Sequence, residues 1–129
     1  MDKTTNSLNW FEIPASDIAR AKKFYETIFN FQMQDMPDMM GMKMAAFPSE
    51  MGSGKANGGL AQSPMHKPSA EGVIIYLNAN GMMDAVIGRI EAAGGKILMP
   101  KTSISKDIGS MAFFADTEGN KLGLHAGPE

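Results

Sequence analysis

Five side chains that could do chemistry or hold a flat molecule fall at alternating positions of three strand-like segments. Trp10 and Glu12 alternate in the first segment, Tyr76 and Asn78 in the second, and His125 lies in the third. Successive side chains of a strand point to opposite faces, so residues two apart share a face. Because carboxylates and imidazoles move protons and a phenol can orient a substrate oxygen, Glu12, His125 and Tyr76 are our candidate catalytic residues.

Each of these residues also has a structural explanation, and the sequence leaves both open. Trp10 can stack on a flat ligand or fill space. Glu12 can be a base whose pKa is raised in an apolar pocket, or a carboxylate that is exposed or paired with a lysine. His125 can be a surface residue near the chain end, Tyr76 can bond within the protein, and Asn78 can end its strand in a turn.

The elements that position these residues can be predicted from the spacing of apolar side chains. A helix capped by Ser16 or Asp17 runs to about Phe29, and Asn30 suits a left-handed residue that ends it. Alternating patterns predict strands on both sides of this helix. The four strands predicted in this half are 8–13, 31–36, 40–47 and 59–62, with a turn at Pro37-Asp38 after the second.

A second set of elements repeats the first after about 64 residues. An apolar stripe from Met83 to Ile90 predicts a helix that is ended by Gly94-Gly95. The strands predicted here are 73–78, 96–99, 108–115 and 121–125, and the last two form a hairpin about 116–120. The sequence therefore predicts one domain, 1–129, with modules at about 7–63 and 72–127. A linker, 64–71, joins them, and its His66 is expected to be solvated.

The duplicated strand–helix–three-strand module resembles the vicinal-oxygen-chelate superfamily of glyoxalase I, bleomycin-resistance proteins and extradiol dioxygenases. Segments 16–26 and 116–122 carry the resemblance, with shorter matches at 76–78 and 91–95. It implies an α+β fold in which two tandem βαβββ modules form a curved mixed sheet around a cavity. It also implies a homodimer.

The resemblance further implies a divalent metal held by one residue on each of four equivalent strands. These positions fall here at Trp10, Gly59, Ile74 and Gly123. None of these side chains can bind a metal, whereas a divalent cation needs several N or O ligands. Glu12 and His125 could supply only two. We therefore expect no metal cofactor, and a displaced metal site is the weaker alternative.

The sequence supports two functions. The face that carries the candidate residues combines aromatic, apolar and polar side chains, as the wall of a ligand cavity does. Its expected ligand-binding residues are Trp10, Ile74, Asn78, Phe47, Met44, Gly59 and Gly123. The first function is that of a metal-independent, glyoxalase-like lyase or isomerase acting on a small organic molecule. The alternative is a protein that binds such a molecule without chemistry, as bleomycin-resistance proteins do.

Composition excludes several other classes of protein. Twelve basic and 14 acidic residues give a net charge of −2, which offers no electrostatic basis for binding nucleic acid or an anionic membrane surface. The absence of cysteine excludes disulfides and cysteine nucleophiles. No apolar run approaches the roughly 18 residues of a membrane span, and the first residues do not have the pattern of a signal peptide. We therefore expect a cytoplasmic protein.

Overall fold

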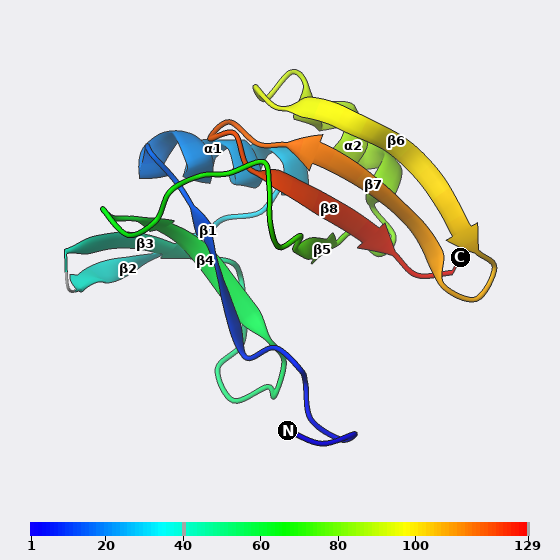
Figure 1. Ribbon diagram of the computed structural model, residues 1–129, viewed down its shortest axis with the longest axis horizontal. Helices are drawn as coiled ribbons and strands as arrows, with labels where there is room; N and C mark the ends of the chain where they lie inside the picture. Colours follow the sequence, from blue (N-terminus) through cyan, green and yellow to red (C-terminus); the bar gives the residue numbers. More distant parts are fainter. Residues whose placement is uncertain (40, 129) are drawn as a thin grey trace.

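The computed structural model describes residues 1–39 and 41–128, and it contains eight strands and two helices (Figure 1). The first module contains β1 (Trp10–Pro14), α1 (Ile18–Phe29), β2 (Gln34–Met39), β3 (Met42–Ala46) and β4 (Asn57–Gln62). The second contains β5 (Tyr76–Asn78), α2 (Met83–Ile90), β6 (Lys96–Ser105), β7 (Gly109–Ala115) and β8 (Lys121–Ala126). The fold is α+β, with two tandem βαβββ modules, as the sequence predicts.

Each module forms a four-stranded mixed sheet, in the orders β1-β4-β3-β2 and β5-β8-β7-β6. The first strand of each module pairs in parallel with the last one. Glu12 lies opposite Gly59 in the first sheet, and Tyr76 lies opposite Gly123 in the second. These two pairs are separated by about 64 residues, so the register confirms the duplication.

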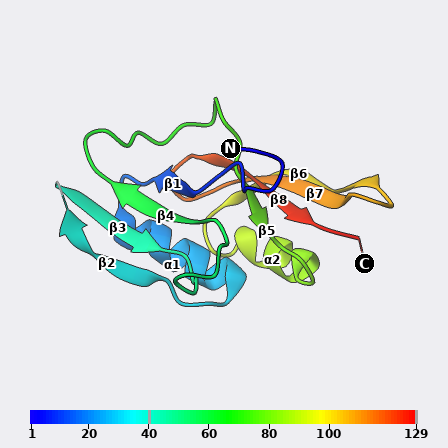
Figure 2. The same cartoon turned by 90° about the horizontal axis from the view of Figure 1, so that it is seen from below.

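Both helices contribute to one hydrophobic core that runs through the two modules. α1 and α2 pack against each other, as Figure 2 shows. Ile13 of β1 and Leu124 of β8 are both buried in this core, as is Phe24 of α1. The Phe24 ring lies 6.1 Å from that of Phe114 on β7, which joins the helix of one module to the sheet of the other. Neither helix of the described chain is long and apolar enough to cross a membrane.

The ends of α1 are set by local side chains, as the sequence predicts. The Asp17 carboxylate accepts a hydrogen bond from the backbone N–H of Arg20, which satisfies one of the free donors of the first turn. Asn30 has φ 55° and ψ 50°, the left-handed conformation that ends many helices. Ala21, Phe24, Tyr25 and Ile28 form the buried stripe of the helix.

Several predicted strand limits are wrong. The predicted turn at Pro37-Asp38 lies inside β2, where the register with β3 shifts between Met36 and Met39. Proline lacks the N–H of a regular ladder, and β2 is an edge strand, so an irregular pairing accommodates it. The strand predicted over 73–78 shortens to β5, and the one predicted over 96–99 extends through β6 to Ser105. Met40, the predicted first residue of the third strand, lies outside the described residues.

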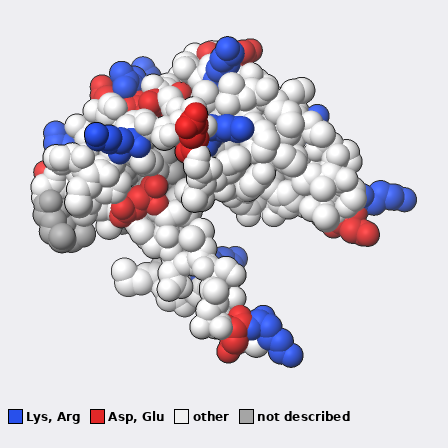
Figure 3. All heavy atoms as spheres, in the orientation of Figure 1, with Lys and Arg blue, Asp and Glu red and all other residues white. Residues whose placement is uncertain are grey.

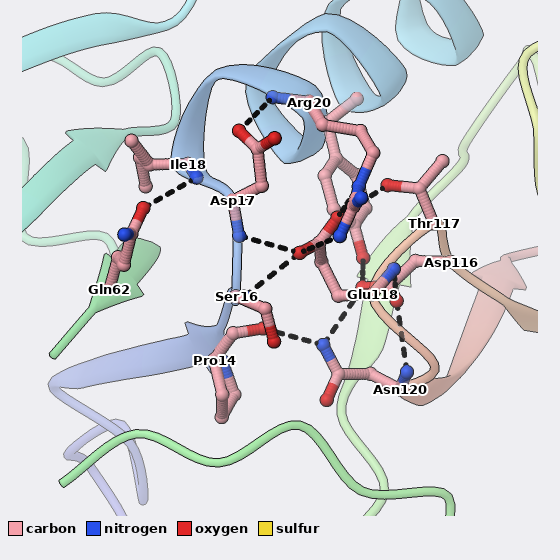
Figure 4. Close-up of polar contacts among 11 residues, drawn as sticks. Pro14, Ser16, Asp17, Ile18, Arg20, Gln62, Asp116, Thr117, Glu118 and Asn120 are labelled. Atoms are coloured by element: carbon pink, nitrogen blue, oxygen red, sulfur yellow. Dashed lines mark hydrogen bonds and ion pairs between the residues drawn. The ribbon is translucent and has the colours of Figure 1, made fainter. Parts of the chain in front are cut away.

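A buried carboxylate connects the two modules at their junction (Figure 4). Asp116, in the turn between β7 and β8, is 5% exposed. It accepts hydrogen bonds from the Tyr25 hydroxyl at 2.8 Å, the Asn120 amide at 2.9 Å and the backbone N–H groups of Glu118 and Asn120. The Asn120 amide also donates to the carbonyl of Pro14 at 2.7 Å. The turn of the second module is therefore fixed to β1 and α1 of the first.

Glu118 of the same turn caps α1 from outside. Its Oε1 accepts the backbone N–H groups of Ser16 and Asp17, and its carboxylate forms a two-bond contact with the Arg20 guanidinium (Figure 4). Burial raises the pKa of Glu118, but the bonds from Arg20 and Asp17 outweigh it, so the pKa is lowered overall. This contact holds the start of α1 beside the second sheet.

Candidate functional site

The candidate residues lie on the side of the two sheets opposite the helices, which we name the open face. Ile13, Leu77 and Leu124 point to the helices and are buried. Their neighbours along the strands, including Glu12 and Tyr76, therefore point to the open face. The open face has one half in each module. The two halves differ in their side chains: the first contains a hydrogen-bonded polar group and the second an aromatic surface.

In the first half, Glu12 is the centre of a hydrogen-bonded group. The indole N–H of Trp10 donates to Glu12 Oε2 at 3.1 Å, and His66 Nε2 lies 2.7 Å from Glu12 Oε1. The hydrogen bond from His66 lowers the pKa of Glu12, burial opposes this and the Trp10 bond adds to it. Glu12 is thus neither a carboxylate of raised pKa nor one paired with lysine, and the prediction of a solvated His66 is wrong.

A cavity of about 180 Å³, which we name the junction cavity, lies beside Glu12. Lys121 and Asn120 of the second module line it, together with Ile75 and the linker residue Lys67. The junction cavity is the place where Glu12 and residues of β8 share a surface. It places two carboxylates, those of Glu12 and Glu71, and two ammonium groups around a small, partly apolar space.

The second half is an aromatic surface on β5, β7 and β8. Tyr76, Gly123 and Phe113 lie opposite one another on the three strands. Gly123 has no side chain, and a Cβ there would meet Tyr76 Cδ1 at 2.5 Å, so the ring lies across β8. The Tyr76 and Phe113 rings are 5.8 Å apart, and Lys121 Nζ lies 4.8 Å from the Phe113 ring centroid. We name Tyr76, Phe113 and Lys121 the aromatic platform.

An open cavity of about 530 Å³, which we name the module-2 cavity, lies next to the platform. Tyr76, Asn78 and His125 line it with Met111. His125 Nε2 donates to the carbonyl of Ile108 at 2.9 Å, which leaves Nδ1 as the lone-pair nitrogen. The structure therefore brings two of the three candidate catalytic residues, Tyr76 and His125, into one cavity and places Glu12 in another.

The remaining expected ligand residues lie in different places. Trp10 is 39% exposed beside Glu12. Ile74 is half-buried and precedes β5 rather than belonging to a strand. Met44 is buried on β3, where it lies opposite Ala61 of β4. Phe47 is on the helix side, where its ring packs 5.7 Å from that of Tyr25.

The four positions at which the family resemblance implies metal ligands do not fit a metal. Trp10 and Ile74 offer an indole and an alkyl chain, and Gly59 and Gly123 have no side chain. In residues 1–39 and 41–128, no group of three or more His, Cys, Asp or Glu side chains is placed to hold a metal ion. We therefore derive no chemical step through a metal at these positions.

Sequence reasoning missed two residues of the open face. Phe113 could have been found, because the hairpin about 116–120 places Phe113 opposite Gly123. His66 had no such signal. It lies between β4 and β5, and only the path of the linker brings it to Glu12.

Charged side chains of both signs are interspersed over the face seen in Figure 3, without a continuous patch of one sign. The charged residues that line the junction cavity are likewise of both signs: Glu12, Glu71, Lys67 and Lys121.

The single tryptophan should report the protonation of Glu12. The lowered pKa means that Glu12 stays ionised, and bonded to Trp10, until the pH falls below 4.5. We expect Trp10 emission to change with a midpoint below pH 4.5 and the change to vanish in Glu12→Gln. The control is Glu71→Gln, whose side chain lines the same junction cavity. A midpoint above 4.5, or a change that persists in Glu12→Gln, would contradict this interpretation.

Comparison with known sequences gives a consistent family. A sequence profile of the Glyoxalase/Bleomycin resistance protein/Dioxygenase superfamily matches residues 7–124. The CFP32 proteins of Mycobacterium bovis and Mycobacterium tuberculosis are 31% identical over 119 residues, which cover 90% of this chain and 44% of theirs. The chain thus spans about half the length of these relatives. A glyoxylase-like domain-containing protein of Didymella fabae is 30% identical over 115 residues, 88% of each chain.

Solved structures share the same architecture. Hypothetical protein SA1046 from S. aureus superposes with a TM-score of 0.66 at 21% identity, over 95% of each chain. The fosfomycin resistance protein FosX from Listeria monocytogenes gives a TM-score of 0.66 at 18% identity, over 98% of this chain and 94% of that one. At these identities the likeness establishes the fold alone.

Proposed function

Because the chain belongs to the Glyoxalase/Bleomycin resistance protein/Dioxygenase superfamily, we propose that its open face binds a small organic molecule without a divalent metal. The observation that carries this proposal is the aromatic platform. The Tyr76 ring packs across Gly123 and is tilted by 50° to the Phe113 ring, and Lys121 Nζ lies over the Phe113 ring. Aromatic surface beside a cation suits a planar molecule that carries an acidic group, because the molecule can stack on one ring and meet the edge of the other.

Anilinonaphthalene sulfonate, a planar aromatic anion, is a suitable probe. We expect Tyr76→Ala to weaken its binding by about 1–3 kcal/mol, because a stacking surface is lost. Isothermal titration calorimetry measures this, and Met51→Ala, at a fully exposed side chain, is the control. Equal affinity in wild type and Tyr76→Ala would overturn the proposal.

Of the two finer functions, binding without chemistry agrees better with the state of the titratable groups. The pKa of Glu12 is lowered by the His66 bond, which makes Glu12 a weaker base, and His125 Nε2 is engaged by a backbone carbonyl. We therefore favour a protein that sequesters its ligand.

Metal-independent proton transfer, as in a lyase or isomerase, is the second candidate function. It is favoured by one observation: Glu12, ionised and held by two hydrogen bonds, faces the junction cavity. Glu12→Gln distinguishes the two functions. An enzyme would lose turnover of its substrate and keep its affinity, whereas a sequestering protein would show no turnover in either form.

We also propose that the chain forms a homodimer. Val73, Ile104 and Ile108 are large apolar residues with 89%, 42% and 53% of their surface exposed. Ile104 lines the module-2 cavity, so a second copy that covers it would also close the site. Sedimentation equilibrium should give twice the 13.9 kDa mass of one chain.

A further inference from the structure

Ser63, His66 and Glu12 form a continuous chain of hydrogen bonds outside the aromatic platform. Ser63 Oγ lies 2.6 Å from His66 Nδ1, and His66 Nε2 lies 2.7 Å from Glu12 Oε1. A neutral imidazole donates from one nitrogen and accepts at the other. The carboxylate at Nε2 therefore favours the proton there and leaves the Nδ1 lone pair facing the Ser63 hydroxyl. Hydroxyl, imidazole and carboxylate in this order can activate a serine.

The Ser63 hydroxyl is also reachable from solvent. Ser63 and His66 line an open groove of about 510 Å³, which we name the linker groove, beyond the end of β4. The backbone N–H of Met65 donates to Ser63 Oγ at 3.1 Å. This contact uses one lone pair of the oxygen and fixes the side chain toward the imidazole.

Two lysines supply positive charge to the same groove. Lys43 and Lys67 line it, and neither takes part in an ion pair with the described residues. A nearby ammonium group stabilises the negative charge that develops on a carbonyl oxygen under attack. Pro64 and Pro68 give the groove an apolar wall.

We propose that Ser63 is a nucleophile for small activated esters, with His66 as its base and Glu12 as the residue that positions His66. Ser63 Oγ attacks the carbonyl carbon, and the hydroxyl proton passes to His66 Nδ1. The ester carbon–oxygen bond then breaks, and its electron pair and the His66 proton leave with the alcohol. Water hydrolyses the acyl-serine to the acid and restores the hydroxyl. This activity is separate from ligand binding on the aromatic platform.

The test uses p-nitrophenyl acetate on the full chain. We expect Ser63→Ala and His66→Gln to release p-nitrophenol at least about tenfold more slowly than wild type. The matched control is Ser69→Ala, at another serine of the linker, and it should match wild type. Ser63→Ala retains the His66–Glu12 bond, so it removes the hydroxyl without freeing the linker.

Peptide mass mapping after brief exposure to the ester gives an independent readout. Acetylation at Ser63 in wild type and in Ser69→Ala, and its loss in His66→Gln, supports the proposal. An unchanged rate in Ser63→Ala, or acetylation at Lys43 and Lys67 alone, overturns it. The anilinonaphthalene sulfonate affinity of Ser63→Ala should equal that of wild type, so the two sites are tested separately.

Discussion

Replacing Asp116 with alanine is expected to lower the free energy of unfolding by about 3–5 kcal/mol. The carboxylate is buried and accepts four hydrogen bonds, two of them from the side chains of Tyr25 and Asn120. Its removal would leave the Tyr25 hydroxyl, which is fully buried, without its acceptor. Urea denaturation, monitored by circular dichroism, measures this decrease in the free energy of unfolding.

The matched control is Asp107→Ala. Asp107 is an exposed aspartate in the turn between β6 and β7, and its removal should change the unfolding free energy by less than about 0.5 kcal/mol. A loss below about 1 kcal/mol in Asp116→Ala would show that the junction network contributes little to stability.

The junction also determines how the two halves of the open face are placed. Asp116 and Glu118 belong to the turn that ends β7 and begins β8, and their partners lie at the end of β1 and in α1. β1 carries Glu12, and β8 carries Lys121 and Gly123. Loosening the turn would therefore alter the junction cavity, where residues of both modules meet.

The parts of the fold that could be predicted from sequence depend on local signals. Asp17 and Asn30 mark the ends of α1 because a cap and a left-handed residue act within one helical turn. The duplication was detectable because the same spacing of apolar residues occurs twice. It also aligned Gly59 with Gly123, and the structure places these two glycines in equivalent registers, opposite Glu12 and Tyr76.

The errors arise where distant contacts override the local pattern. Pro37 reads as a turn residue, but the pairing of β2 with β3 incorporates it as an irregularity at a sheet edge. Val73 reads as a strand residue, yet only the last three residues of that segment pair with β8. The length of β6 depends on its pairing with β7, whose register shifts three times.

In the candidate site, too, local sequence signals predicted some residues correctly, whereas distant contacts determined others. Strand alternation and register place Tyr76 and His125 on the same face of the sheet, and the two residues line one cavity. The partner of Glu12 could not be predicted, because His66 reaches it across 54 positions through an irregular linker. That contact lowers the pKa of Glu12, against the interpretation of a base with a raised pKa, since a donor to a carboxylate favours its charged form.

Two glycines that are equivalent in the duplication should respond differently to alanine. A Cβ at Gly59 would collide with the backbone carbonyl oxygen of Ala45 on the neighbouring strand. Backbone inside a sheet cannot move aside cheaply, so Gly59→Ala should lower the unfolding free energy by about 2–3 kcal/mol. The three atoms nearest to a Cβ at Gly123 all belong to the ring of Tyr76, a residue that is 46% exposed and whose side chain can rotate into solvent.

The Gly123→Ala variant should therefore keep most of the stability of the wild-type protein and lose ligand affinity. The displaced Tyr76 ring would leave Phe113, and we expect the affinity for anilinonaphthalene sulfonate to fall about tenfold, while the unfolding free energy changes by less than about 1 kcal/mol. Calorimetry and urea denaturation on both variants measure the contrast. Equal affinity in wild type and Gly123→Ala would show that the position of the Tyr76 ring does not matter for binding. A large stability loss in Gly123→Ala would instead give Tyr76 a structural role, because its ring would then be needed to hold β5 against β8.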